Sequence, residues 1–298
     1  MTTVSNIFPW QNPALKLVED KTVGSFKFER YTLESVFIGK SMTCGRIYPT
    51  ALSDLKERTT IYVIHGLVGD DSLLVNLGLF EGLPKDLVEI CEKRGVELIL
   101  PNCGSGVLRY DTLESKESYT DYFSKEIMPI AEADTANSAA HRFLLGYSIG
   151  GTSALRMLLE DPDLFDGAGL IFSAIFYHDI YSETESADYI ARTGADPVLV
   201  THGCQSLREL FYDREDYERF NPIPFLRDID SSALKGKKLY LDVGGADEIG
   251  LWEGARKTSA LLEEKNIAHV FDERPGAAHD MESLKIGIRN GLRFLLSE

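Results

Sequence analysis

The chain has 298 residues, 44% of them hydrophobic and 26% charged, which is ordinary for a globular protein and enough for one large α/β domain or two small ones. No apolar run reaches the roughly 18 to 20 residues needed to span a bilayer, so we expect no membrane partner. The formal net charge of −16 argues against nucleic acid as a partner, because phosphates would be repelled over most of the surface.

The start of the chain and its cysteines both bear on the compartment. The first residues, MTTVSNIFPWQNPALKLVED, lack the basic start and the apolar stretch of a secretion signal, so we expect a cytoplasmic protein unless a signal has been removed. The cysteines form no CxxC pair and no tight cluster, which favours reduced, packed thiols over a zinc site or a disulfide framework. They are Cys44, Cys91, Cys103 and Cys204.

Most of the chain alternates between two kinds of segment. The part up to about Thr50 includes FKFERYTLESVFIG and predicts antiparallel edge strands. After it, apolar runs rich in β-branched residues, typical of strands buried on both faces, alternate with longer amphipathic segments. This alternation predicts a doubly wound α/β domain with a mostly parallel sheet and helices on both faces. The predicted strands start at Thr60, Val96, Arg142, Gly167, Lys238 and Ala268, and the predicted helices at Ser118, Thr152, Leu251 and Met281.

One segment, from about Ala174 to Leu234, breaks the alternation. It is crowded with aromatic residues, charges and prolines, which is less typical of a loosely ordered loop than of a cap or lid. We therefore predict a single domain over residues 1–298 with a cap over about 174–234. Its aromatic side chains could line an aryl or acyl pocket, or could simply hold the cap on the sheet; they are Phe176, Tyr177, Tyr181, Phe211 and Tyr212.

Ser148 is the candidate nucleophile. It lies at the centre of Gly146-Tyr147-Ser148-Ile149-Gly150, which fits G-x-S-x-G directly after a predicted strand and directly before a predicted helix. The turn is so sharp that the residues two before and two after the serine must lack bulk. The helix N-terminus carries a partial positive charge, which favours an anion that develops at this point.

A serine hydroxyl needs a base, and His279 is the best candidate. It lies in RPGAAHDMESL, a loop between the last predicted strand and the last predicted helix. His269 falls within a predicted strand, where a packed or edge position is the better interpretation. Surface or cap-packing roles are favoured for His141, His178 and His202.

The base needs a carboxylate to fix its tautomer. GADEIG follows the strand KLYLDVG and offers Asp247, with Glu248 as its main rival. Asp242 lies inside the strand and should point into the fold. The chain order of Ser148, Asp247 and His279 is the order expected of α/β-hydrolases.

Acyl transfer also needs main-chain N–H donors that face the oxyanion. One is expected at Ile149, which follows the nucleophile. The other is expected in His65-Gly66-Leu67, where Gly66 allows a close approach and Leu67 supplies the N–H. His65 is then expected to brace this loop, in preference to binding a metal.

These motifs together resemble the putative esterase family of α/β-hydrolases, which includes S-formylglutathione hydrolase, tributyrin esterase and feruloyl or acetyl-xylan esterase modules. The likeness runs from about Tyr62 to Leu296 and rests on IHGLVGDDS, LPNCGSGVLRYDT, SYTDYFSKEIMPIAE, LLGYSIGGTSALRMLLEDPDLF, LYLDVGGADE and PGAAHDMESL. It implies the α/β-hydrolase fold, no cofactor and no metal. It also implies Ser148 as nucleophile, Asp247 as acid, His279 as base and the amides of Leu67 and Ile149 as oxyanion hole.

The chain also departs from the family pattern. Ile149 stands where relatives often have Met, which leaves the amide donor unchanged. Relatives often carry Trp soon after the HG motif and after the base, where this chain has Leu73 or Leu74 and Met281. The acyl or alcohol pocket is therefore expected to differ in shape, which weakens the transfer of any particular substrate.

The sequence thus predicts a serine carboxylesterase that hydrolyses small acyl esters through an acyl-enzyme. The substrate would be a small-molecule ester, with an acylated sugar or a thiol conjugate among the candidates, and a homo-oligomer is compatible with the sequence. Two alternatives stay open: an acyltransferase of the same fold, in which an alcohol replaces water, and a binding module that keeps the fold without catalysis.

Overall fold

A computed structural model describes residues 14–51, 58–108, 118–132 and 141–297. The chain divides into two compact units, the first formed by residues 1–63, 69–104 and 108–142 and the second by residues 64–68, 105–107 and 143–298. The prediction of a single domain over residues 1–298 stays a prediction. The expectation about a secretion signal rests largely on residues 1–13, which lie outside the described residues, as does the RYDT part of the quoted family motif beyond Leu108.

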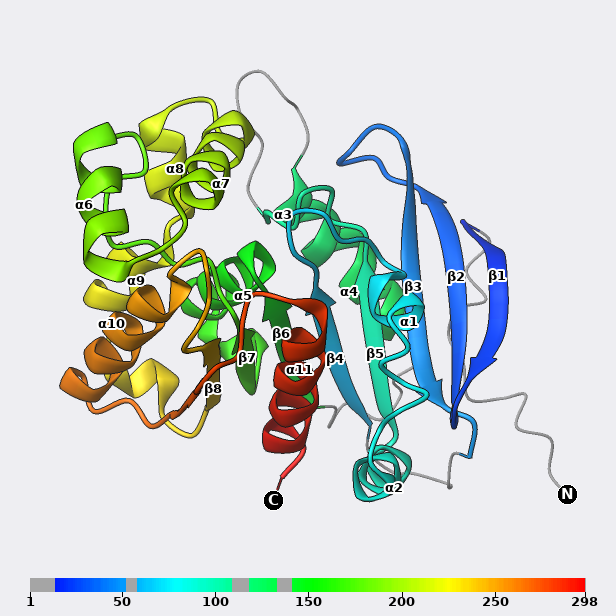
Figure 1. Cartoon of the computed structure of the whole chain (residues 1–298). Helices are drawn as coiled ribbons and strands as arrows, with labels where there is room; N and C mark the ends of the chain where they lie inside the picture. Colours follow the sequence, from blue (N-terminus) through cyan, green and yellow to red (C-terminus); the bar gives the residue numbers. More distant parts are fainter. Residues whose placement is uncertain (1–13, 52–57, 109–117, 133–140, 298) are drawn as a thin grey trace, which may run out of the picture. The chain divides into compact units, whose positions relative to one another are not determined.

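The first unit holds a mixed sheet with strand order β1-β2-β3-β5-β4 (Figure 1). Antiparallel pairs join β1 to β2, β2 to β3 and β3 to β5, whereas β4 and β5 are parallel. The predicted antiparallel N-terminal strands are thus confirmed. The strands are β1 (Leu15–Val23), β2 (Phe26–Glu34), β3 (Ser41–Pro49), β4 (Thr59–Ile64) and β5 (Val96–Pro101).

Helices of the first unit are short apart from α2 (Lys85–Arg94), which ends at Gly95 in a left-handed conformation. The stretch predicted as one helix from Ser118 begins with the Ser118 side chain accepting from Asp121 N–H. It then contains a π-helical turn between two short α-helices. These elements are α3 (Tyr119–Asp121), η1 (Tyr122–Ile127) and α4 (Met128–Glu132), and α1 (Leu73–Asn76) precedes them in the chain.

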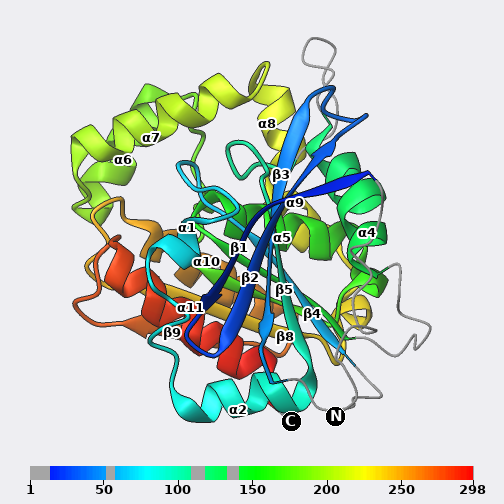
Figure 2. The same cartoon turned by 90° about the vertical axis from the view of Figure 1, so that its right-hand side faces the viewer.

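The second unit holds a parallel sheet with strand order β6-β7-β8-β9. Strand β7 is buried at every residue, as expected for a strand covered on both faces. Helix α5 packs against β7, α10 against β8, and α11 against both strands (Figure 2). Their bounds are β6 (His141–Tyr147), α5 (Ile149–Glu160), η2 (Pro162–Leu164), β7 (Gly167–Ile171), β8 (Lys238–Gly244), α10 (Leu251–Glu264), β9 (Val270–Arg274) and α11 (Met281–Leu295).

The predicted cap segment is largely helical. It lies between β7 and β8 and comprises α6 (Glu183–Thr193), α7 (Pro197–Leu210), α8 (Arg214–Phe220), α9 (Pro222–Asp228) and η3 (Ser231–Leu234). All five are preceded by a residue whose side chain accepts a main-chain N–H, and a proline is the first residue of α7 and of α9. The segment is therefore an ordered helical insertion, which excludes the loosely ordered loop.

The aromatic residues of the predicted cap segment differ in their contacts. Phe211 is buried and its ring packs against Tyr217 and Phe220 at 5.3 and 5.1 Å between ring centroids. Tyr177 donates its hydroxyl to Thr258 Oγ1 of α10, whereas Tyr212 is exposed. Packing thus accounts for Phe211 and Tyr177, the simpler of the two interpretations.

All four cysteines are free and buried, as expected for packed thiols. Burial raises the pKa of Cys91 to about 12. It also raises the pKa of the other three thiols, so none is set up as a thiolate nucleophile.

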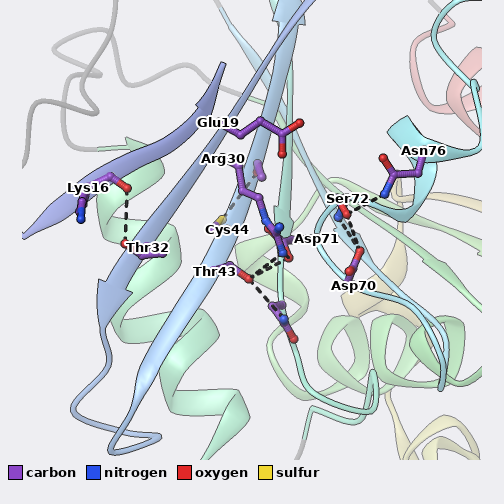
Figure 3. A network of polar contacts seen from close by, with 12 residues as sticks. Lys16, Glu19, Arg30, Thr32, Thr43, Cys44, Asp70, Asp71, Ser72 and Asn76 are labelled. Atoms are coloured by element: carbon purple, nitrogen blue, oxygen red, sulfur yellow. Dashed lines mark hydrogen bonds and ion pairs between the residues drawn. The ribbon is translucent and has the colours of Figure 1, made fainter. Parts of the chain in front are cut away.

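A buried carboxylate organises polar contacts in the first unit (Figure 3). Asp71, whose side chain is fully buried, accepts two hydrogen bonds from Arg30 of β2 at 2.6 and 2.8 Å and one from Thr43 of β3 at 2.8 Å. Asn102, which follows β5, donates to Thr43 Oγ1 at 3.3 Å. The network therefore ties the segment after β4 to the N-terminal strands.

Replacing Arg30 tests this network. Arg30→Met leaves the buried Asp71 carboxylate with Thr43 alone, and a buried charge that loses its partner costs about 3 kcal/mol. We expect chemical denaturation to show a free energy of unfolding lower by that amount. Lys27→Met, which removes a partly exposed ion pair to Asp20, should cost less than about 1 kcal/mol. Equal losses in the two variants would contradict this account.

Candidate functional site

Ser148 lies on a strained turn between β6 and α5. Its backbone has φ 54° and ψ −127°, a conformation that L-residues adopt only when the surroundings impose it, at a cost on the order of 1–3 kcal/mol. The Ser148 N–H donates to Ile171 O at 2.9 Å, and Ser148 O accepts from the N–H groups of Gly151 and Ala174, each at 3.0 Å. Three main-chain hydrogen bonds thus hold Ser148 in this strained conformation.

Close packing explains the two glycines that flank Ser148. A Cβ atom at Gly146 would come within 2.2 Å of Gly150 O. A Cβ atom at Gly150 would come within 2.3 Å of the carbonyl oxygens of Ile64 and His65. The G-x-S-x-G pattern is therefore a steric requirement of this turn, as the sequence predicted.

The loop after β4 lies against this turn. A Cβ atom at Gly66 would be 3.2 Å from Ser148 Cβ, so the Gly66 backbone passes beside the serine side chain. Leu67 follows directly and is half-buried, while Ile149 is buried at the first position of α5. Each of the two predicted oxyanion donors therefore directly follows a residue of this contact: Leu67 follows Gly66, and Ile149 follows Ser148.

A second loop supports the first. A Cβ atom at Gly106 would lie 2.1 Å from His65 O, and Gly106 O accepts from Ser153 Oγ of α5 at 2.8 Å. The His65 side chain is buried, and its Nδ1 lies 2.7 Å from Gly66 O. This agrees with a bracing role for His65 in the loop.

Asp247 and His279 meet as predicted. His279 Nδ1 lies 2.8 Å from Asp247 Oδ2, and because a carboxylate can only accept, Nδ1 carries the proton. The Asp247 side chain is fully buried, and its Oδ1 accepts from Ile249 N–H at 2.8 Å and Gly250 N–H at 3.1 Å. The carboxylate is thus held rigidly, with the imidazole as its third donor.

The structure also separates Asp247 from its rivals. Glu248 Oε2 accepts from the main-chain N–H of His279 at 3.0 Å and does not bond the ring. Asp242 points into the fold, where Arg274 donates to both of its oxygens at 2.7 and 2.8 Å. Burial raises the pKa of Asp242, and Arg274 opposes that rise. Asp242 is therefore a structural ion pair.

Strand order explains why residues so far apart in the sequence gather here. Tyr147 of β6 pairs with Ile171 of β7, which in turn pairs with Asp242 of β8. The segments that follow these strands therefore leave one edge of the parallel sheet together, the edge at which α/β folds bind their ligands. Ser148, Asp247 and His279 follow β6, β8 and β9 at this edge, within the second unit.

Phe172 and Arg274 belong to the site and were missed from the sequence. Phe172 follows β7 with φ 47°, and its buried ring meets the His279 ring edge-on, with centroids 5.5 Å apart. The Arg274 guanidinium lies 5.2 Å from the centroid of the Phe172 ring. The sequence showed Arg274 only as a charged residue in the strand VFDER, and it did not indicate that Asp242 is its partner.

The four remaining histidines, apart from His65 and His279, take no part in the site. His141 and His202 are exposed. Ring nitrogens of His269 lie 2.7 Å from Ser259 Oγ and 3.0 Å from Ile267 O, which matches a packed position. His178 is buried in the cap segment, where its ring stacks on Tyr189 and desolvation lowers its pKa.

Within the part of the chain that the structure describes, no cluster of three or more His, Cys, Asp and Glu side chains could hold a metal ion. None of the helices formed by the described residues is long and apolar enough to cross a membrane.

Comparisons with known proteins bear on the family and the fold. A family model described as putative esterase matches residues 35–284. The chain is similar in structure to a ferulic acid esterase (TM-score 0.69, 18% identity, covering 91% of this chain and 98% of that one). It is also similar to an S-formylglutathione hydrolase from Agrobacterium tumefaciens (TM-score 0.66, 14% identity, covering 94% and 98%).

A third similar structure is the substrate-bound fluorophosphonate-binding serine hydrolase F of Staphylococcus aureus (TM-score 0.63, 17% identity, covering 92% and 100%). At these identities the likeness shows the fold, which is the predicted α/β-hydrolase fold. A search of curated protein sequences finds no match.

The Arg274–Asp242 pair behind the site gives a stability prediction. Arg274→Met leaves the buried Asp242 carboxylate without a cation and with only the 3.4 Å hydrogen bond from the Tyr240 hydroxyl, so the free energy of unfolding should fall by about 3 kcal/mol in chemical denaturation. Arg256→Met is the matched control, because Arg256 makes an equally bidentate but exposed pair with Glu273, and it should cost less than about 1 kcal/mol. A small loss for Arg274→Met would show that the pair contributes little.

Proposed function

The chain belongs to the putative esterase family of α/β-hydrolases and is a carboxylic ester hydrolase, and we propose that Ser148, His279 and Asp247 form its catalytic triad. One observation carries the proposal: the Asp247–His279 hydrogen bond lies at the sheet edge that also carries Ser148 on its strained turn. In this role Asp247 keeps the proton on Nδ1, so that Nε2 of His279 is free to accept one.

The proposed reaction has two halves. Ser148 Oγ attacks the ester carbonyl while His279 takes its proton, and the tetrahedral intermediate expels the alcohol, which receives that proton from His279. An acyl group then remains on Ser148. Water attacks this acyl-enzyme with His279 again as base, and the acid leaves as the serine regains its proton.

The main-chain N–H groups of Leu67 and Ile149 are proposed to bind the oxyanion. The close approach of Gly66 to Ser148 supports Leu67, and the position of Ile149 at the start of α5 adds the positive end of that helix. Each donor of this kind contributes roughly 10²–10³-fold to the rate.

We propose small acyl esters as the substrate class, with acylated sugars and thiol conjugates as candidates. Similar structures are described as a ferulic acid esterase and an S-formylglutathione hydrolase, so esters of an aromatic acid and an acylated thiol are both named for proteins of this fold. We further propose that α6 to α9 form the cap of this site. In support, Asp196 N–H and the Tyr189 hydroxyl donate to Glu248 O and Ile249 O, in the segment that directly follows Asp247.

The nucleophile can be tested directly. A fluorophosphonate probe should label the wild-type protein, and Ser148→Ala should abolish both the labelling and the turnover of p-nitrophenyl acetate, because the variant lacks the hydroxyl that attacks. Ser232→Ala, at an exposed serine in η3, is the control and should still be labelled. Labelling of Ser148→Ala at the wild-type rate would refute the proposed triad.

Acyl chain length tests the proposed substrate class. We expect turnover of p-nitrophenyl esters to be fastest with short acyl groups, because the rings of Phe211 and Tyr217 in the cap segment pack against each other, with centroids 5.3 Å apart, and are not spread out to receive a long acyl chain. The measurement is kcat/KM across acyl chain lengths, beside acetylated and feruloylated sugars. An optimum at long chains would rule out this preference.

A further inference from the structure

We propose that Glu248 is a positioning residue that holds the main chain of His279 for catalysis. The inference rests on the proposed function, in which His279 is the base. Its direct support is the hydrogen bond from His279 N–H to Glu248 Oε2, 3.0 Å long, beside the bond from His279 Nδ1 to Asp247. Two neighbouring carboxylates thus hold one histidine, at its ring and at its backbone.

This contact completes a series between two loops. Beyond the last β8–β9 pair, Gly245 N–H donates to Arg274 O at 2.9 Å and Ala246 N–H donates to Ala277 O at 3.0 Å. Asp247 and Glu248 continue the series with their side chains. Each residue from 245 to 248 therefore bonds the segment 274–279, and Glu248 makes the last contact, at His279 itself.

Two attachment points matter because of the geometry of histidine. The ring can turn about two side-chain torsions, and a bond at Nδ1 alone lets Nε2 swing whenever the loop moves. His279 is preceded by the sequence Pro275-Gly276-Ala277-Ala278, which is exposed at its first two residues and half-buried at the next two. A bond at the main-chain N–H fixes the other end of the residue, so that Nε2 keeps its direction.

Glu248 is itself held from the opposite side. Its main-chain oxygen accepts from Asp196 N–H, at the start of α7, at 2.8 Å. The next residue, Ile249, accepts from the Tyr189 hydroxyl at 2.9 Å and donates to Asp247 Oδ1. The predicted cap segment therefore anchors the backbone of residues 248 and 249 through these two hydrogen bonds. The Glu248 side chain is exposed, so its position is set by this anchored backbone and by the bond to His279.

The test compares three variants on p-nitrophenyl acetate. Glu248→Ala should lower kcat about tenfold with KM within about twofold, because an ill-placed base slows the chemistry and leaves binding unchanged. Glu248→Gln keeps a carbonyl acceptor and should restore kcat to within about threefold of wild type. Glu185→Ala removes another exposed glutamate that accepts a main-chain N–H, that of Asp179 at 2.8 Å, and should match wild type.

Each outcome decides the matter. The inference is wrong if Glu248→Ala keeps the wild-type kcat, or if Glu248→Gln is as slow as Glu248→Ala, since charge and not the hydrogen bond would then matter. It is also wrong if Glu248→Ala and Glu185→Ala both melt at a lower temperature than wild type and both lose activity to a similar extent, since general destabilisation would then explain the loss. Loss of activity in His279→Ala together with normal Glu248→Ala would overturn only this inference, whereas an active His279→Ala would overturn the proposed triad.

Discussion

The hydrogen bond between Asp247 and His279 is the contact on which the site depends. It joins two loops that are 32 residues apart in the chain, and it sets which imidazole nitrogen carries the proton. The carboxylate can do this because its other oxygen is saturated by two main-chain N–H groups, so it has no competing partner and no freedom to turn. Asp247 is thus buried without being unsatisfied, the condition under which a buried carboxylate is tolerable.

Arginine–carboxylate pairs support both units of the structure. In the second unit Arg274 bridges Asp242 of β8 and the carbonyl of Ser283 in α11, and its guanidinium faces the Phe172 ring that meets His279. In the first unit Arg30 and Asp71 join β2 to the segment after β4. In each pair the carboxylate is fully buried and the arginine only partly exposed, so the charge is neutralised where water cannot solvate it.

Ser148 and Phe172 both have strained backbones: each follows a buried parallel strand and each has a positive φ value. Each conformation is held by main-chain hydrogen bonds to the neighbouring strand: Ser148 N–H donates to Ile171 O, and Phe172 N–H donates to Asp242 O at 2.7 Å. These hydrogen bonds to neighbouring strands offset the cost of the strained conformations, and the spacing of the strands sets how far apart the two residues lie.

Local and periodic features were readable from the sequence alone. The apolar runs predicted the buried parallel strands, and the glycines around Ser148 predicted a turn in which a Cβ has no room. The chain order of Ser148, Asp247 and His279 is the one expected of the α/β-hydrolase fold, and that fold is the one observed. The helical nature of the cap segment was not predicted, because aromatic and proline-rich composition carries no clear period.

Tertiary structure alone decided which neighbour does what. Asp247 and Glu248 are adjacent acids of nearly equal chemistry, and only the path of the 274–279 segment gives the ring to one and the backbone to the other. Asp242 became an ion-pair partner because β9 carries Arg274 beside it, and Phe211 became cap packing because Tyr217 and Phe220 fold onto it. Such roles depend on contacts between residues distant in sequence, and the local pattern of a strand or loop does not specify which distant side chain will contact it.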